Sequence, residues 1–284
     1  MGKRRVRAGI GALALAVALS GASAGVAGAA GAVGAAVDGA HSPVKPFPEG
    51  PLGEAIRYGE LLVTQTQDYA KPYVGNGLRC TNCHLDRGQM PYAAPFTGLW
   101  GVFPEYSARD AAVVTLQTRL NDCFLRSMNG RALPADSKEM VGLLAYVWWL
   151  SQGVPTGVDA AGRGFRDIRL PPGAKPDAVA GKALYAQKCA ACHGGDGQGL
   201  ANAGGQYTFP PLWGPQSFNI GAGMARTGTA AAFIQTKMPL GQGGTLTDKE
   251  AFDIAAYITR QPRLDFPPKS ADWPKGGKPA DAPY

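Results

Sequence analysis

The sequence predicts an all-α chain of two small, related modules in tandem. Two Cys-x-x-Cys-His motifs, beginning at Cys80 and Cys189, are each followed by a Leu-Trp-Gly tripeptide and then by an apolar helix with an N-terminal capping pattern. No stretch of useful length alternates between apolar and polar residues as a strand does. The length of 284 residues fits two domains of modest size.

Residues 1–24 have the composition of a cleaved secretory signal peptide. Four basic residues precede an apolar stretch from Ile10 to Leu19, and Ala22-Ser23-Ala24 resembles a cleavage site. The apolar stretch is too short to span a bilayer comfortably, so we expect no stable membrane insertion. Without the signal, 24 basic residues remain against 21 acidic ones, which argues against a nucleic-acid partner. We expect a periplasmic protein.

The two repeated motifs are the signature of covalent c-type haem attachment. They are Cys80-Thr81-Asn82-Cys83-His84 and Cys189-Ala190-Ala191-Cys192-His193. In this arrangement two thiols reach the two vinyl groups of one porphyrin while the adjacent imidazole reaches its iron. The alternative is a redox dithiol or half of a zinc site. The occurrence of the complete motif twice in an exported chain argues against that alternative. We therefore expect two haem c groups, with His84 and His193 as iron ligands.

The first module is expected over residues 51–153, after an Ala/Gly-rich and Pro-containing segment at 25–50. A helical pattern covers Glu54 to Leu62, and Asp136-Ser137-Lys138-Glu139 is a capping box before the closing helix. Both modules have the organisation of class I cytochrome c-like haem domains.

The second module is expected over residues 178–262, after a Gly- and Pro-rich linker at 154–177. Its opening helix covers Gly181 to Gln187, and Thr247-Asp248-Lys249-Glu250 caps its closing helix. A Pro/Lys-rich tail at 263–284 either wraps a surface or is disordered.

The second ligand of each iron decides what the haems do. The chain has only three histidines, so His41 alone is left once two are used, and bis-histidine ligation of both haems is impossible within one chain. Met238, followed by Pro239, is the candidate for the second haem, because a thioether is the usual partner of histidine in electron-carrying cytochromes c. Lys237 is its neighbour, and its simplest interpretation is a solvated surface charge.

Two candidates compete for the first iron. The repeat can be aligned in two ways. Counted forward from its Trp, Cys123 of the first module corresponds most nearly to Met238 of the second. Counted back from the helix caps, Met128 corresponds most nearly to Met238. Cys123 is the unpaired fifth cysteine, and free cysteines are often small buried hydrophobic residues. Met90 and Met140 are weaker candidates.

Residues around Cys123 indicate an anion pocket beside a thiolate-ligated iron. If a helix runs from Ser107 to Ser127, one of its faces carries basic, thiol and hydroxyl groups where aliphatic ones are usual. These residues are Arg109, Arg119, Cys123 and Ser127, with Arg126 close by. Neutralisation of haem propionates by the arginines is the alternative.

From about Pro51 to Gln261 the chain resembles the dihaem c-type cytochrome thiosulfate dehydrogenases, which include related tetrathionate reductases. The most specific part runs from Arg119 to Pro134, with the sequence Arg-Leu-Asn-Asp-Cys-Phe-Leu-Arg-Ser-Met-Asn-Gly-Arg-Ala-Leu-Pro. The resemblance implies His84/Cys123 ligation of a catalytic haem. It also implies an electron-transfer haem with Met238 or Lys237 as distal ligand, and it places Arg109, Arg119 and Ser127 where substrate contacts are expected.

The resemblance also implies an oxidoreductase that joins two thiosulfates into tetrathionate and releases two electrons, with the reverse reduction as the other direction. A small periplasmic cytochrome or iron–sulfur protein is the expected electron partner. Two alternatives remain, namely a dihaem cytochrome that only transfers electrons and a Sox-type cytochrome subunit without turnover of its own.

Overall fold

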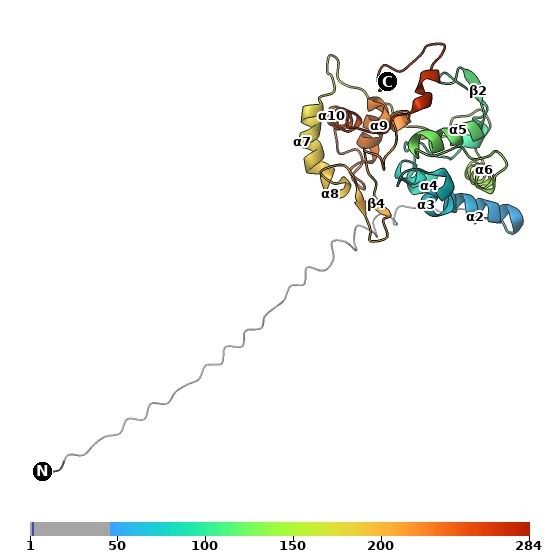
Figure 1. The fold of residues 1–284 in the computed structure, drawn as a ribbon, viewed down its shortest axis with the longest axis horizontal. Helices are drawn as coiled ribbons and strands as arrows, with labels where there is room; N and C mark the ends of the chain where they lie inside the picture. Colours follow the sequence, from blue (N-terminus) through green and yellow to red (C-terminus); the bar gives the residue numbers. More distant parts are fainter. Residues whose placement is uncertain (1, 3–45) are drawn as a thin grey trace. The chain divides into compact units, whose positions relative to one another are not determined.

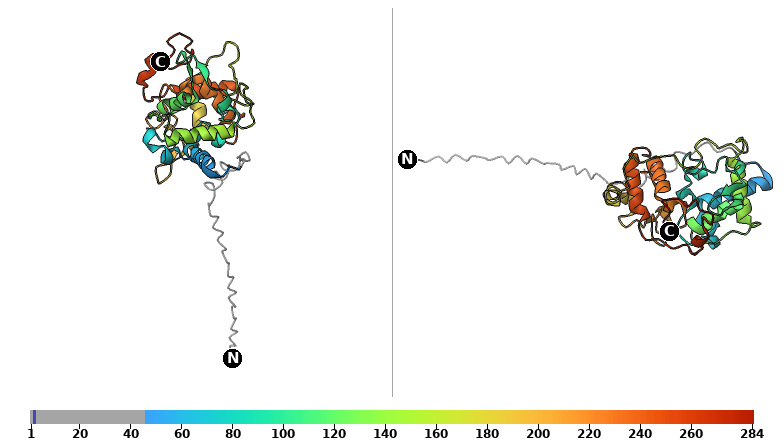
Figure 2. Two further views of the ribbon diagram at one scale, coloured as in Figure 1. Left: turned by 90° about the vertical axis from the view of Figure 1, so that its right-hand side faces the viewer. Right: turned by 90° about the horizontal axis from the view of Figure 1, so that it is seen from above.

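Two pairs of packed helices, one from each half of the chain, organise the fold. The first pair is α2 (Gly50–Thr64) on α6 (Lys138–Leu150). The second is α7 (Ala178–Lys188) on α10 (Asp248–Thr259), and α9 (Thr227–Lys237) also packs on α10. The computed structural model describes Gly2 and residues 46–284, so His41 and the predicted signal peptide apart from Gly2 lie outside the described residues. Figure 1 shows the helices of the two halves in two separate groups, and Figure 2 gives two further views of them.

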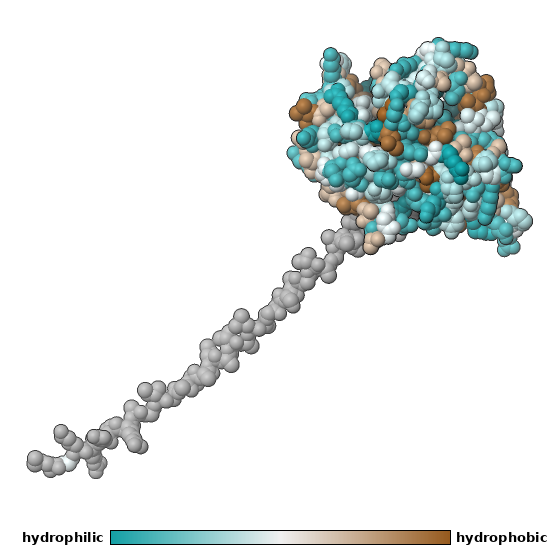
Figure 3. Space-filling model, in the orientation of Figure 1, coloured by the Kyte–Doolittle hydropathy of each residue, from teal (hydrophilic) through white to brown (hydrophobic). Residues whose placement is uncertain are grey.

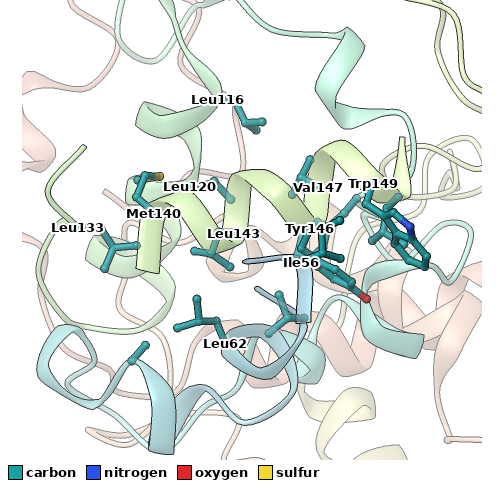
Figure 4. Close-up of a cluster of buried hydrophobic side chains, with 14 of the residues drawn as sticks. Ile56, Leu62, Leu116, Leu120, Leu133, Met140, Leu143, Tyr146, Val147 and Trp149 are labelled. Carbon is teal, nitrogen blue, oxygen red and sulfur yellow. The ribbon is translucent and has the colours of Figure 1, made fainter. Parts of the chain in front are cut away.

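The first helix pair encloses an apolar core. Ser137 caps α6 by accepting a hydrogen bond from the Met140 backbone N–H, one residue later than the predicted cap. The side chains that α2 and α6 bury meet segments from the rest of this half, as Figure 4 shows. Fully buried members of the cluster include Ile56, Leu62, Met140, Tyr146 and Val147.

The second helix pair has its own core and a complete capping box. Thr247 accepts from the Glu250 backbone N–H, and the Glu250 carboxylate accepts from the Thr247 backbone N–H. Ile254 and Ala255 of α10 pack with Tyr185 of α7 and with Ile234 of α9. The predicted capping pattern is therefore present at atomic level in this half.

Glycines let the helices of both pairs cross at close range. A Cβ atom added to Gly59 would lie 2.1 Å from the Gly142 carbonyl oxygen, and one added to Gly181 would lie 1.9 Å from the Asp253 carbonyl oxygen. Neither space admits a methyl group. The two modules thus share their manner of helix packing as well as their motifs.

The predicted all-α class is confirmed, with two short hairpins added. Strand β1 (Glu105–Ser107) pairs with β2 (Ala112–Val114), and β3 (Leu200–Ala201) pairs with β4 (Tyr207–Phe209). The remaining elements are short helices: α3 (Thr66–Tyr69), η1 (Lys71–Tyr73), η2 (Cys80–Asn82), α4 (Leu85–Gly88), η3 (Leu99–Gly101), α5 (Leu116–Asp122), η4 (Cys123–Ser127), α8 (Ala190–His193), η5 (Gly223–Ala225) and η6 (Pro267–Ala271).

The first hairpin corrects one prediction. A continuous helix from Ser107 to Ser127 was expected, but the chain turns between β1 and β2, and α5 begins only at Leu116. The β-branched run Val113-Val114-Thr115 favours extended backbone, and the Thr115 side chain caps α5 by accepting from Thr118 N–H. Arg109 therefore lies in a hairpin turn and not on the helix that leads to Cys123.

Apolar contacts also join the halves. A third buried cluster combines Leu78 and Met128 with Phe218, Ala222 and Ala225. The described residues from 46 onward accordingly form part of one compact unit. On the face shown in Figure 3, hydrophobic residues occur in small groups among hydrophilic ones. Within residues 46–284 no helix has the length and apolar character needed to cross a membrane.

Candidate haem-binding and substrate site

The first Cys-x-x-Cys-His motif forms a tight turn through η2. The His84 backbone N–H donates to the Cys80 carbonyl at 2.9 Å, and Thr66 anchors the turn by accepting from the Cys80 backbone N–H at 3.1 Å. His84 Nδ1 lies 2.6 Å from the Ala94 carbonyl oxygen. Because a carbonyl only accepts, Nδ1 is the protonated nitrogen, and Nε2 is left with a free lone pair for a metal.

The second motif repeats this arrangement in α8. The His193 backbone N–H donates to the Cys189 carbonyl at 2.9 Å, and His193 Nδ1 donates to the Pro210 carbonyl at 2.9 Å. Both imidazoles are thus held in the tautomer that an iron ligand requires, with one cysteine directly before each histidine and a second cysteine four residues before it. These residues fit two covalently attached haem c groups.

Cys123 begins a single π-helical turn that continues α5. Its Sγ accepts a hydrogen bond from Arg119 Nη1 at 3.4 Å, and the His84 side chain is close enough to influence the pKa of the thiol. Burial raises the pKa of the Cys123 thiol, but the Arg119 charge and the neighbouring His84 imidazole outweigh it and lower the pKa to about 7. The imidazole and the sulfur therefore lie close together, and both are donors that could hold one haem iron.

Two of the competing methionines, Met128 and Met140, lie in apolar clusters. Met128 is buried between Leu78 and the Phe218 segment, and Met140 is fully buried in the core of the first helix pair. Of the two principal candidates from the sequence, only Cys123 has a described contact with His84.

The predicted anion pocket is assembled only in part. Arg119 contacts Cys123, and Ser127 ends the same turn, where its carbonyl accepts from Asn76 Nδ2 at 2.8 Å. Arg109 instead donates to the Gly221 carbonyl at 3.2 Å and stacks its guanidinium over the Trp273 ring, 5.3 Å from the centroid. The expectation that these side chains share one helix face is wrong for Arg109.

Arg126 joins the Cys123 turn to the C-terminal tail through buried ion pairs. Its guanidinium binds Asp272 through two hydrogen bonds of 2.8 Å, and its Nε donates to Asp122 at 3.2 Å. Only 7% of the Arg126 side chain and 5% of the Asp272 side chain are exposed. Two carboxylates already neutralise this arginine, whereas the guanidinium of Arg119 contacts the Cys123 sulfur directly.

Sequence reasoning missed the groups that surround the Cys123 turn. Asn219 and Asn76 bind its carbonyl groups, and Asp272 binds its arginine. Each comes from a segment distant in sequence, and no spacing or motif marks it. The tail after Pro262, expected either to wrap a surface or to be disordered, packs here: the Trp273 backbone N–H donates to the Arg109 carbonyl at 2.7 Å.

The candidate ligands of the second haem stand at the end of α9. Lys237 is the last residue of that helix and Met238 its C-cap. Met238 and Cys189 pack against the same core cluster of the second helix pair. Lys237 is partly buried, and this burial lowers its pKa. A lowered pKa makes the neutral, metal-binding form of an amine easier to reach.

Two protein-family models match the chain, and each match contains one of the two Cys-x-x-Cys-His motifs. The family described as SoxA/TsdA, cytochrome c domain, matches residues 66–156. The family described as cytochrome c oxidase, cbb3-type, subunit III, matches residues 176–258.

Curated proteins resemble the chain over most of its length. A thiosulfate dehydrogenase from Allochromatium vinosum is 49% identical over 79% of this chain and 84% of its own. One from Psychrobacter arcticus is 46% identical over 82% of this chain and 71% of its own. The solved structure of the thiosulfate dehydrogenase TsdBA from Marichromatium purpuratum superimposes with a TM-score of 0.76 at 42% identity. That match covers 80% of this chain but half, 50%, of the solved one.

Proposed function

The chain belongs to the family of thiosulfate dehydrogenases, and we propose that it oxidises two thiosulfate dianions to tetrathionate at the site around Cys123. In this reaction a bond forms between the two terminal sulfurs and two electrons are released. The observation that carries the proposal is the convergence of the Cys123 thiol, the His84 imidazole and the Arg119 guanidinium. The reverse reduction would use the same site.

The ligand assignment follows from this convergence. His84 and Cys123 would hold the first iron, and His193 with Met238 or Lys237 would hold the second. Cys80 with Cys83, and Cys189 with Cys192, would form the thioether bonds. When bound, the two haem c groups supply one-electron redox chemistry, so together they can hold the two electrons that the reaction releases.

The substrate's charge explains why an arginine stands beside the thiol. Two dianions repel each other strongly at bonding distance, and fixed positive charge in a partly buried place opposes this repulsion. Arg119 is 3.4 Å from Cys123 Sγ and can donate charge-assisted hydrogen bonds to sulfonate oxygens. Ser127, at the end of the same turn, is a further candidate donor. Arg109 is proposed to act from the hairpin side, where its charge is close enough to Arg126 for the two to influence each other.

The wider organisation is part of the same proposal. Residues 1–24 would direct export to the periplasm, residues 51–153 would hold the catalytic haem and residues 178–262 the electron-transfer haem. Residues 154–177 would link the two domains, and residues 263–284 would form the tail. A small periplasmic cytochrome or iron–sulfur protein would accept the electrons.

The test is turnover by the purified holoprotein with thiosulfate and an artificial one-electron acceptor, with tetrathionate measured as product. We expect one tetrathionate for every two electrons accepted. A protein with both haems attached that produced no tetrathionate and formed no thiosulfate from added tetrathionate would contradict the proposal. That result would favour an electron-transfer cytochrome or a Sox-type subunit.

A further inference from the structure

Several backbone carbonyl groups of the π-helical turn that carries Cys123 accept hydrogen bonds from other segments of the chain. In this turn the Met128 backbone N–H bonds the Cys123 carbonyl at 2.9 Å, five residues back. A π-turn is rare and tends to occur at functional sites, since ordinary helix geometry is more stable without outside support. The support here comes from residues far from Cys123 in sequence.

Asn219, from the loop before η5, holds two successive carbonyl groups of the turn. Its side-chain Nδ2 donates to the Leu125 carbonyl at 2.9 Å, and its backbone N–H donates to the Arg126 carbonyl at 3.1 Å. Asn219 is only 4% exposed, and its Oδ1 accepts from the Gly221 backbone N–H at 2.9 Å. Both polar atoms of the amide have a hydrogen-bond partner, which defines the orientation of the amide and fixes the turn against the second half of the chain.

The C-terminal tail holds the side chain of the same turn. Asp272 grips the Arg126 guanidinium with two hydrogen bonds of 2.8 Å, and the Tyr284 hydroxyl donates to the same carboxylate. The Phe266 ring lies under the guanidinium, 4.3 Å from the ring centroid. Gly221 closes the packing, since a Cβ atom there would lie 3.1 Å from Arg126 Nη1. The C-terminal tail and the loop around Asn219 and Gly221 therefore both contact Arg126 of the turn.

We propose that Asn219 and the Arg126–Asp272 pair are positioning groups that hold the Cys123 turn in the geometry that directs its thiol to His84. The inference rests on the proposed role of Cys123 as an iron ligand. Without these contacts the Leu125 and Arg126 carbonyls lose their partners and Arg126 loses its anchor, and relaxation to regular helix pairing would redirect the sulfur. The second half of the chain and its tail thereby control ligation in the first half.

The experiment uses the full-length dihaem protein with Asn219→Leu, Asp272→Asn and the control Asp281→Asn. Asp281 is also in the tail, but its carboxylate binds the Gly228 backbone N–H and not the Cys123 turn. Electron paramagnetic resonance of the oxidised protein reports the fraction of the first haem that carries a thiolate ligand. The signal of the second haem in the same sample shows that the remainder of the protein is folded.

We expect Asn219→Leu and Asp272→Asn to lower the thiolate-ligated fraction at least twofold and thiosulfate turnover at least tenfold, with Asp281→Asn unchanged. Should Asp272→Asn fail to fold, Tyr284→Phe removes one hydrogen bond from the same carboxylate and should shift the signal in the same direction. Parent-like signals in Asn219→Leu and in whichever tail variant folds would overturn the inference. A parent protein without any thiolate signal would instead contradict the proposed function.

Discussion

The His84 imidazole helps to lower the pKa of the Cys123 thiol, so the one cysteine outside the two attachment motifs lies close to the histidine of the first motif. His84 is oriented by the Ala94 carbonyl and Cys123 by its π-helical turn, and neither depends on the other for its position. Two independently held donors that meet at one point are an arrangement suited to a single iron.

Replacement of Cys123 by glycine should abolish thiosulfate turnover while both haems remain attached. The substitution removes the sulfur but leaves Cys80, Cys83 and His84 in place, so haem content measured after denaturation should equal that of the parent. Met128→Leu is the matched control, since Met128 is buried in a cluster of apolar residues and the change conserves volume. Full activity of the Cys123→Gly protein would remove Cys123 from the mechanism, and lost activity in Met128→Leu would point to the competing ligand.

Arg119→Gln should reduce kcat/KM for thiosulfate by about 10- to 100-fold. A hydrogen bond to a charged group contributes about 1.5–3 kcal/mol, and each 1.4 kcal/mol corresponds to tenfold. Arg169→Gln is the control, because Arg169 pairs with Asp167 on the open surface. Steady-state rates at several salt concentrations check the electrostatic origin: the parent should lose activity with salt more steeply than Arg119→Gln. Equal rates for parent and variant would show that Arg119 does not bind the substrate.

The ligand of the second haem should change with its redox state. The Lys237 amine is the harder donor and suits Fe(III), whereas the Met238 thioether is softer and suits Fe(II). Spectra of oxidised and reduced protein should therefore differ in ligand signature. Lys237→Ala should give the methionine signature in both states, and the exposed Lys182→Ala should behave as the parent. A methionine signature in both states of the parent would leave Lys237 as a surface charge.

The sequence predicted those parts of the site and fold that depend on residues close together in the chain. The attachment motifs are contiguous, and the helices around Ile56 and Ile254 show the apolar period directly. The prediction of a helix from Ser107 was wrong because it relied on the helical spacing of charged and hydroxyl-bearing residues. In the structure the preference of Val113 and Val114 for extended backbone prevails. Asn219 and Asp272 could not be predicted, since their role depends on which distant segments pack together.

Gly181→Ala should destabilise the second half of the chain although alanine is the better helix former. A Cβ atom at this position would lie 1.9 Å from the Asp253 carbonyl oxygen, so α7 and α10 must separate. Overpacking of this kind costs about 1–3 kcal/mol. Gly223→Ala is the control, because its Cβ atom would meet nothing within 4 Å. Thermal unfolding should show a lower Tm for Gly181→Ala only; an unchanged Tm would mean that the helices do not cross so closely.

Asp272→Asn should lower the free energy of unfolding by about 3 kcal/mol at neutral pH, because it leaves the buried Arg126 with one carboxylate instead of two. Burial raises the pKa of Asp272, but the hydrogen bonds from Arg126 and Tyr284 outweigh it and hold the pKa below its ordinary value. A depressed pKa in the folded state stabilises the protein at pH above the ordinary aspartate pKa of about 3.9, and this contribution is lost as the pH falls through the folded value. Denaturant unfolding of parent and variant should therefore give curves that converge below about pH 4. Asp167→Asn, which disrupts an exposed pair, should show no measurable difference at any pH. A difference between parent and Asp272→Asn that stayed constant from neutral to acid pH would mean that the charge of Asp272 is not what stabilises the tail.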